Sequence, residues 1–227
     1  MITAVIFDMD GLLIDSEPLW RRAETASFAD VGLALTPEMC RQTMGMRTDE
    51  MVRYWFDRHP WSGPSLKEIE LLVISRLSRL IYEEARPMSG AIELVRRFER
   101  TGLNMAIASS SPLPIIETVA DRFGIAGVVR TLRSAESQPY GKPHPGVFID
   151  TAKDLGCRPA ECLVFEDSIN GVIAGKAAKM TTIAVPDKAM LNRPEFSIAD
   201  LTISTLNDFD DRCFDRFIGA ERIQQVL

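Results

Sequence analysis

An apolar segment near the start of the chain, Ile2–Phe7, runs directly into two acidic residues, Asp8 and Asp10. Its length and its β-branched residues predict a buried strand. A carboxylate at the end of such a strand is costly to desolvate unless an opposite charge compensates it, and a bound cation is the simplest compensation. The alternative is a strand end that carries two solvated acids. Gly11, which follows the pair, predicts a sharp turn or the close approach of a ligand to the backbone.

Strand-like and helix-like patterns alternate through most of the 227 residues. This alternation predicts an α/β fold in which helices cover both faces of a parallel sheet. The predicted strands are Ile2–Phe7, Asn104–Ala108, Cys162–Phe165 and Thr181–Val185, with a weaker one at Val128–Leu132. The predicted helices of this part are Ser89–Arg100, Pro145–Leu155 and Ile169–Lys179.

Residues 17–85 break this alternation, because they show helical periods and no clear strand. We expect them to form a helical domain inserted into a core domain that comprises residues 1–16 and 86–227. The two hinges would be Leu12–Glu17 and Ala85–Ser89. Ser65 and Glu68 have the spacing of a capping box at the start of one helix. The helices predicted here are Pro18–Asp30, Thr48–Arg58 and Ser65–Tyr82.

Polar residues follow three of the predicted strands. Asp8 and Asp10 follow the first, the serines 109–111 follow the second, and Glu166 and Asp167 follow the third. Ligands of open parallel sheets bind at the carboxyl ends of the strands, so these side chains are expected at one edge. An oxygen-rich set of carboxylates suits Mg²⁺, which also takes waters and a substrate phosphate as ligands. Helix capping is the alternative role for the two later groups.

Lys142 lies in a loop between Gly141 and Pro143, shortly before a predicted helix. A lysine held in such a loop can act as a point charge for phosphate. Ser109 and the free N–H groups near it can bind an anion at the start of the next helix. An exposed lysine and an ordinary serine cap are the alternatives.

The composition excludes several classes of protein. The net charge of −6 argues against non-specific binding to nucleic acid or anionic membranes. No apolar stretch approaches the ~20 residues of a membrane span, and Asp8 interrupts the N-terminal apolar run, which argues against a signal peptide. The four cysteines form no CxxC pair, so neither zinc nor a disulfide framework is expected. We expect a cytoplasmic monomer.

Taken together, these residues make the chain resemble the haloacid dehalogenase-like hydrolase superfamily. Asp8-Met9-Asp10-Gly11 resembles its first motif, Ile107-Ala108-Ser109-Ser110 its second, Lys142 its third and Glu166-Asp167 its fourth. The resemblance implies a Rossmann-like parallel sheet core with an inserted α-helical cap domain. Within the superfamily, the segments Phe7–Pro18, Ala108–Leu113 and Glu166–Gly171 are similar to bacterial sugar-phosphate phosphatases of the 2-deoxyglucose-6-phosphate or hexitol-phosphate type.

The resemblance implies that Asp8 attacks phosphorus to form an aspartyl-phosphate. Asp10 would protonate the leaving oxygen and later deprotonate the attacking water. Asp8, the backbone carbonyl of Asp10 and Asp167 would hold Mg²⁺, with Glu166 in or beside that shell. The substrate is expected to be a small sugar phosphate ester. The residues expected to contact it are Gly11, Glu17, Trp20, Arg47, Ser109, Ser110 and Lys142.

Two other functions stay open. A phosphosugar mutase of the β-phosphoglucomutase type shares the core motifs, but carries at the position of Trp20 a histidine that couples cap closure to acid–base chemistry. Trp20 is expected not to make that contact, which favours water as the acceptor. Relatives that release halide lack an acid at the position of Asp10, so this residue favours phosphoryl transfer. The third candidate is a non-catalytic signalling protein phosphorylated on aspartate, which the early position of Asp8 and the helical insert argue against.

Overall fold

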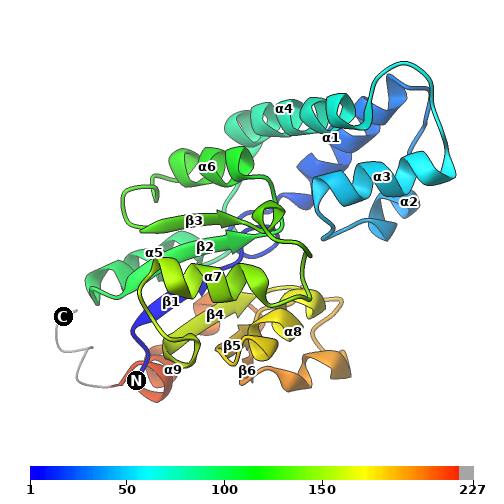
Figure 1. Ribbon diagram of the computed structural model, residues 1–227. Coiled ribbons are helices and arrows are strands. Elements are labelled where there is room, and N and C mark those ends of the chain that lie inside the picture. Colours follow the sequence, from blue (N-terminus) through cyan, green and yellow to red (C-terminus); the bar gives the residue numbers. More distant parts are fainter. Residues whose placement is uncertain (220–227) are drawn as a thin grey trace.

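The computed structural model describes residues 1–219 and has a parallel β-sheet at its centre (Figure 1). The six strands lie in the order β3-β2-β1-β4-β5-β6. The chain passes outward from β1 in both directions, first to β2 and β3 and then to β4, β5 and β6. The strands are β1 (Ala4–Phe7), β2 (Asn104–Ser109), β3 (Thr131–Ser134), β4 (Cys162–Glu166), β5 (Thr181–Ala184) and β6 (Leu201–Thr202).

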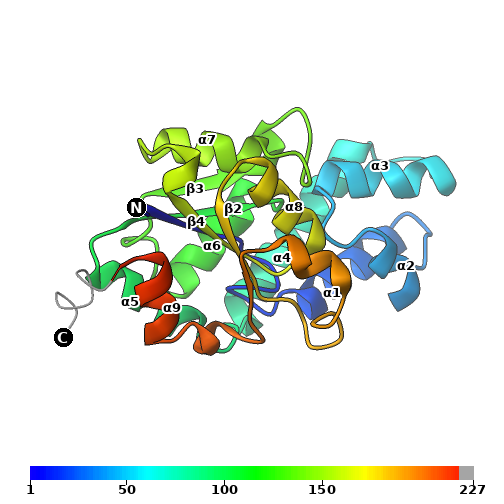
Figure 2. The same ribbon diagram turned by 90° about the horizontal axis from the view of Figure 1, so that it is seen from below.

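Strand β1 is buried on both faces, as its continuous apolar sequence requires. Val5 and Phe7 point to one face and pack in a core with α5 (Ala91–Arg100), α6 (Leu113–Arg122) and α9 (Asp211–Phe217). Ala4 and Ile6 point to the other face and pack with α7 (Gly146–Asp154) and α8 (Ile169–Ala177). Figure 2 shows α7 and α8 on one side of the sheet and α5 and α9 on the other. The α/β class and the parallel sheet predicted from the sequence are confirmed.

The helical segment after β1 lies beyond the carboxyl ends of the strands (Figure 1). It consists of α1 (Glu17–Ala29), α2 (Pro37–Gln42), α3 (Thr48–Arg58) and α4 (Leu66–Glu84). Its interior is a separate apolar cluster that includes Phe28, Trp55 and Val73. The capping box is present at the start of α4, where the Ser65 hydroxyl accepts from the Glu68 N–H and the Glu68 carboxylate accepts from the Ser65 N–H. A helical insert is therefore observed.

The two connections to this helical segment lie side by side. The Asp15 N–H donates to the Arg86 carbonyl at 3.1 Å, and the Met88 N–H donates to the Leu13 carbonyl at 3.0 Å. The predicted hinges are thus hydrogen-bonded to each other through their backbones. The assignment of residues 1–16 and 86–227 to one domain and 17–85 to another stays a prediction. Residues 220–227 of that assignment lie outside the described part of the chain.

The differences from the predicted elements are local. The weak strand expected at Val128–Leu132 begins instead at Thr131, because the N–H groups of Val128 and Val129 bond to the Ile125 carbonyl in a turn. The short elements α2, α9 and β6 were not predicted. Strand β6 has two residues and exists through its pairing with β5. Within residues 1–219, no helix has both the length and the apolar composition that crossing a bilayer requires.

Glu24 is an unusual residue in the interior of the helical segment. It lies on α1 with 8% of its surface exposed, and its Oε2 atom has no hydrogen-bond partner among the described residues. Burial raises the pKa of Glu24 to about 7, although a hydrogen bond with the Cys40 thiol and the charge of Arg21 act in the opposite direction. Since the unfolded chain ionises this group near 4.5, the folded protein holds the proton more tightly.

We expect Glu24→Gln to remove a pH-dependent loss of stability. The neutral form of Glu24 makes its full contribution to the free energy of unfolding below the unfolded pKa of 4.5. This contribution is lost as the pH rises through about 7. The loss is on the order of 3 kcal/mol at pH 8. Urea unfolding should therefore find the variant stabilised at pH 8 and much less so near pH 5. Glu117→Gln, at an exposed site on α6, serves as the control. An equal difference at both pH values would contradict the expectation.

Candidate active site

The carboxyl ends of β1, β2 and β4 bring three sets of polar residues together. Phe7 pairs in register with Ile107 on one side and with Phe165 on the other. The register therefore places Asp8, after β1, level with Glu166 at the end of β4, and Ser109 one residue further along at the end of β2. A parallel sheet with this topology positions ligands at that edge.

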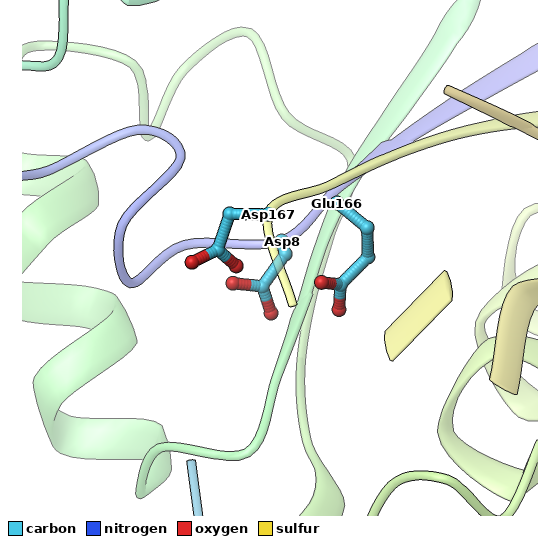
Figure 3. Close-up of side chains that lie close together, drawn as sticks. All are labelled: Asp8, Glu166 and Asp167. Atoms are coloured by element: carbon cyan, nitrogen blue, oxygen red, sulfur yellow. The ribbon is translucent and has the colours of Figure 1, made fainter. Parts of the chain in front are cut away.

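Three carboxylates form the centre of the site. Figure 3 shows the side chains of Asp8, Glu166 and Asp167 converging from β1 and from the end of β4. One oxygen of each lies within 4.8 Å of the others. Asp8 and Glu166 are buried, and Asp167 is partly buried. Repulsion between like charges this close is relieved by a cation or by protonation, and the all-oxygen donor set is of the kind that Mg²⁺ prefers.

Lys142 supplies one positive charge to this group. Its Nζ atom donates to Asp8 Oδ1 at 2.6 Å, to Glu166 Oε1 at 2.5 Å and to the Ala108 carbonyl at 3.1 Å. The second oxygen of Glu166 accepts from the N–H and the hydroxyl of Ser168. Glu166 is thus held by protein donors on both oxygens, and one of its roles is to position the lysine.

The electrostatics of the site follow from burial. Burial raises the pKa of Asp8 to about 7, against the opposing charge of Lys142 and with the help of Glu166 and Asp10. Burial and the charge of Glu166 also raise the pKa of Asp167 well above its ordinary value. Burial lowers the pKa of Lys142, but Asp8 and Glu166 more than offset this, so the lysine stays charged.

Asp167 is the carboxylate that has room for a cation. Among residues 1–219, no side-chain or backbone group donates a hydrogen bond to its carboxylate. With Asp8, Asp167 and Glu166 on one side and a single lysine on the other, the carboxylates outnumber the cation. The residues present therefore fit a divalent ion between Asp8 and Asp167.

Two glycines allow these carboxylates to approach the backbone. Gly11 has a φ of +76°, and a Cβ at this position would lie 2.3 Å from Asp167 Oδ2. A Cβ at Gly171 would lie 1.7 Å from Glu166 Oε1. Gly11 thus makes both the turn and the close approach, and the group that approaches it here is a carboxylate of the site.

Asp10 lies apart from the three central carboxylates and accepts four hydrogen bonds. Its Oδ1 accepts from the Ser16 hydroxyl at 2.5 Å and from the Trp20 indole N–H at 2.9 Å. Its Oδ2 accepts from the Ser111 hydroxyl at 2.6 Å and from the Ser109 hydroxyl at 3.3 Å. The carboxylate is therefore oriented by the hinge, by α1 and by the end of β2 at once.

The contact of Trp20 with Asp10 corrects the sequence prediction. Trp20 was expected not to reach the acid–base residue, and this expectation is wrong. An indole cannot titrate as an imidazole does, but its N–H is a hydrogen-bond donor of fixed direction. Trp20 lies one turn into α1, close enough to the hinge for its ring to reach back over Asp10.

Three further residues were predicted to contact the substrate: Glu17, Arg47 and Ser110. Glu17 is exposed and pairs with Arg21 on the same helix at 3.1 Å. Arg47 has its guanidinium bonded to protein groups, as described below. Ser110 lies beside the site, but among the serines 109–111 the one closest to Asp10 is Ser111. Ser111 and Ser16 were missed as individual site residues, although the run of serines 109–111 was a signal for the first.

Substitution of Ser111 is expected to impair turnover more than substitution of its neighbour. Ser111→Ala removes a short hydrogen bond to a carboxylate, and such bonds contribute roughly 1.5–3 kcal/mol. We expect kcat to fall about tenfold or more, while Ser110→Ala, which has the same size change and no bond to Asp10, changes it by less than about threefold. Steady-state kinetics on both variants test this. Equal losses would show that the hydrogen bond does not orient Asp10.

Comparison with known proteins identifies relatives over most of the chain. A family model described as "Hydrolase: haloacid dehalogenase-like hydrolase" matches residues 2–179. Hexitol phosphatase B of Escherichia coli (strain K12) is 45% identical over 209 residues, which cover 91% of this chain and 94% of the relative.

Solved structures share the fold. CbbY from Rhodobacter sphaeroides, in complex with phosphate, superposes with a TM-score of 0.83 at 26% identity and covers 92% of this chain and 96% of its own. β-Phosphoglucomutase from Clostridium difficile has a TM-score of 0.81 at 20% identity, and the match covers 98% of this chain and 100% of the mutase. The second likeness establishes a common architecture and leaves the reaction open.

Proposed function

The chain belongs to the haloacid dehalogenase-like hydrolases, as its motifs predicted, and from this premise we propose that it is a Mg²⁺-dependent phosphatase of small sugar phosphates. The observation that carries the proposal is Lys142 Nζ bonded to both Asp8 and Glu166, with the free carboxylate of Asp167 beside them. The 45% identity to a hexitol phosphatase supports a hexose or hexitol phosphate as the substrate.

Asp8 acts as the nucleophile. An oxygen of its carboxylate forms a bond to phosphorus while the bond to the leaving alkoxide breaks, which produces an aspartyl-phosphate and the free sugar. Lys142 donates a hydrogen bond to Asp8 Oδ1, and it can redirect one of its N–H donors to a phosphoryl oxygen. Burial of Asp8 excludes water from the ground state and leaves the carboxylate to react with the ester.

Asp10 moves the protons. Its carboxyl protonates the leaving alkoxide in the first step, then takes a proton from the water that hydrolyses the aspartyl-phosphate, and inorganic phosphate leaves. The donors from Ser16, Trp20 and Ser111 hold it beside the reacting group.

The phosphate dianion must be neutralised before an anion can attack it. Asp8, Asp167 and the backbone carbonyl of Asp10 would hold Mg²⁺, with Glu166 in or beside that shell. The ion, when bound, supplies positive charge to the phosphoryl oxygens. Lys142, Ser109 and the backbone N–H of Ser110 would bind the same oxygens from the protein side, while Gly11 leaves the backbone accessible.

The cap is proposed to select the leaving group. Trp20 lies on α1 with its indole N–H bonded to Asp10, and Glu17 lies one turn earlier on the same helix. The net charge of −6 argues against nucleic-acid or membrane partners, so the partner is a small-molecule phosphate ester. We propose that the protein acts as a monomer in the cytoplasm.

A screen of metabolite phosphates tests the proposed activity. We expect release of inorganic phosphate from hexose and hexitol phosphates, and from p-nitrophenyl phosphate, that is lost when EDTA removes the metal and restored by Mg²⁺. Asp8→Asn should lower kcat by about a thousandfold or more, since it removes the nucleophile. A label from the substrate should appear on Asp8 in trapped enzyme. Turnover that is insensitive to metal, or a label on another residue, would refute the mechanism.

The mutase alternative has its own test. A mutase passes the phosphoryl group to a second sugar hydroxyl and accumulates a sugar bisphosphate, whereas a phosphatase passes it to water. Trp20 cannot exchange a proton with Asp10, which supports water as the acceptor. Incubation with glucose 1-phosphate and glucose 6-phosphate should yield free phosphate and glucose. Detection of a bisphosphate or of interconversion by NMR would favour the mutase.

A further inference from the structure

Arg47 crosses from the helical segment to the loop that carries Lys142. It lies at the N-terminus of α3, and 12% of its side chain is exposed. Its Nη1 atom donates to the backbone carbonyl of Gln138 at 2.8 Å. Gln138 directly follows the 3₁₀ turn η1 (Ala135–Ser137) and precedes Lys142 by four residues. The guanidinium therefore joins two parts of the protein that are distant in sequence.

The rest of the guanidinium is held by the helix that presents it. Nε and Nη2 donate to the two oxygens of Asp49 at 3.1 and 2.9 Å, and Glu50 lies 3.4 Å from Nε. This two-pronged pairing fixes the plane of the arginine. The aliphatic part of the side chain packs on the same loop, since a Cβ at Gly141 would lie 3.4 Å from Arg47 Cγ. Arg47 thus bonds to one end of segment 138–141 and lies beside the other.

The charges around Arg47 make its contact with Gln138 important for holding the helical segment against the loop that carries Lys142. Glu136, in η1, has a buried Oε1 without a hydrogen-bond partner among the described residues. Burial and the charges of Glu70 and Asp49, on α4 and α3, raise the pKa of Glu136, while Lys67 and Arg47 act in the opposite direction. Carboxylates from both sides therefore repel each other here, and the bond from Arg47 to Gln138 opposes that repulsion.

We propose that Arg47 is a positioning residue that orders segment 138–141 and so holds Lys142 against Asp8 and Glu166. The proposal rests on the proposed function for the role of Lys142. It replaces the expectation that Arg47 binds the substrate, because three hydrogen bonds and one ion pair direct its guanidinium at protein groups. Its effect on turnover is therefore independent of the leaving group.

Kinetics on two unlike substrates separate the two roles. For Arg47→Ala we expect kcat/KM to fall by the same factor, roughly ten- to a hundredfold, for a hexitol 6-phosphate and for p-nitrophenyl phosphate, which has no hydroxyl to bind. Arg47→Lys, which retains one donor for the Gln138 carbonyl, should recover part of the loss. A raised KM for the hexitol phosphate with unchanged p-nitrophenyl phosphate kinetics would overturn the proposal.

Hydrogen exchange measures the contact without relying on activity. Exchange in residues 138–142 should become faster in Arg47→Ala and stay unchanged in β1 and β4. Arg41→Ala is the matched control, because Arg41 pairs with Glu38 on α2 and is exposed. If Arg47→Ala does not fold, Asp49→Asn, which releases one side of the guanidinium, should show a smaller change at the same residues.

Unchanged exchange at 138–142 in a folded variant would refute the positioning role. A wild-type protein that hydrolyses neither substrate would instead refute the proposed function, and the exchange experiment would still report on the Arg47 contact. The two failures are therefore distinguishable.

Discussion

The ammonium of Lys142 between Asp8 and Glu166 is the interaction on which the site depends. Parallel strands deliver several carboxylates to one edge, where burial and mutual repulsion favour their neutral forms. Lys142 offsets part of that cost with two ion pairs of 2.6 and 2.5 Å. Within residues 1–219, Asp167 has no ion-pair partner, and under the proposed function a divalent cation would compensate its charge.

Close packing at the sheet edge depends on two positions without a side chain, Gly11 and Gly171. Asp167 lies against the backbone of Gly11, and Glu166 lies against that of Gly171. Any Cβ at these positions would displace a carboxylate of the site. The turn after β1 and the start of α8 are therefore built around the acids, and the sheet register keeps both at the level of Asp8.

The helical segment takes part in the site through two separate contacts. Trp20 donates to Asp10, the residue proposed to move protons, and Arg47 donates to the loop of Lys142, the residue proposed to hold charge. One contact lies near the hinge and the other lies at the N-terminus of α3. Each joins segments that are remote in sequence, so the geometry of both depends on how the helical segment sits on the sheet.

The sequence by itself determined the α/β class, the parallel sheet, the helical insert and the positions of Asp8, Asp10, Lys142, Glu166 and Asp167. These follow from local patterns, because a buried strand and the polar residues at its end are adjacent in the chain. Only the tertiary structure decided that Trp20 reaches Asp10, that Ser111 lies closer to Asp10 than Ser109 does and that Arg47 bonds to Gln138. The existence of strand β6 was also decided only by the tertiary structure. Such contacts join residues that are far apart in the sequence, or select one residue among adjacent candidates. Their direction depends on packing that no local sequence pattern shows.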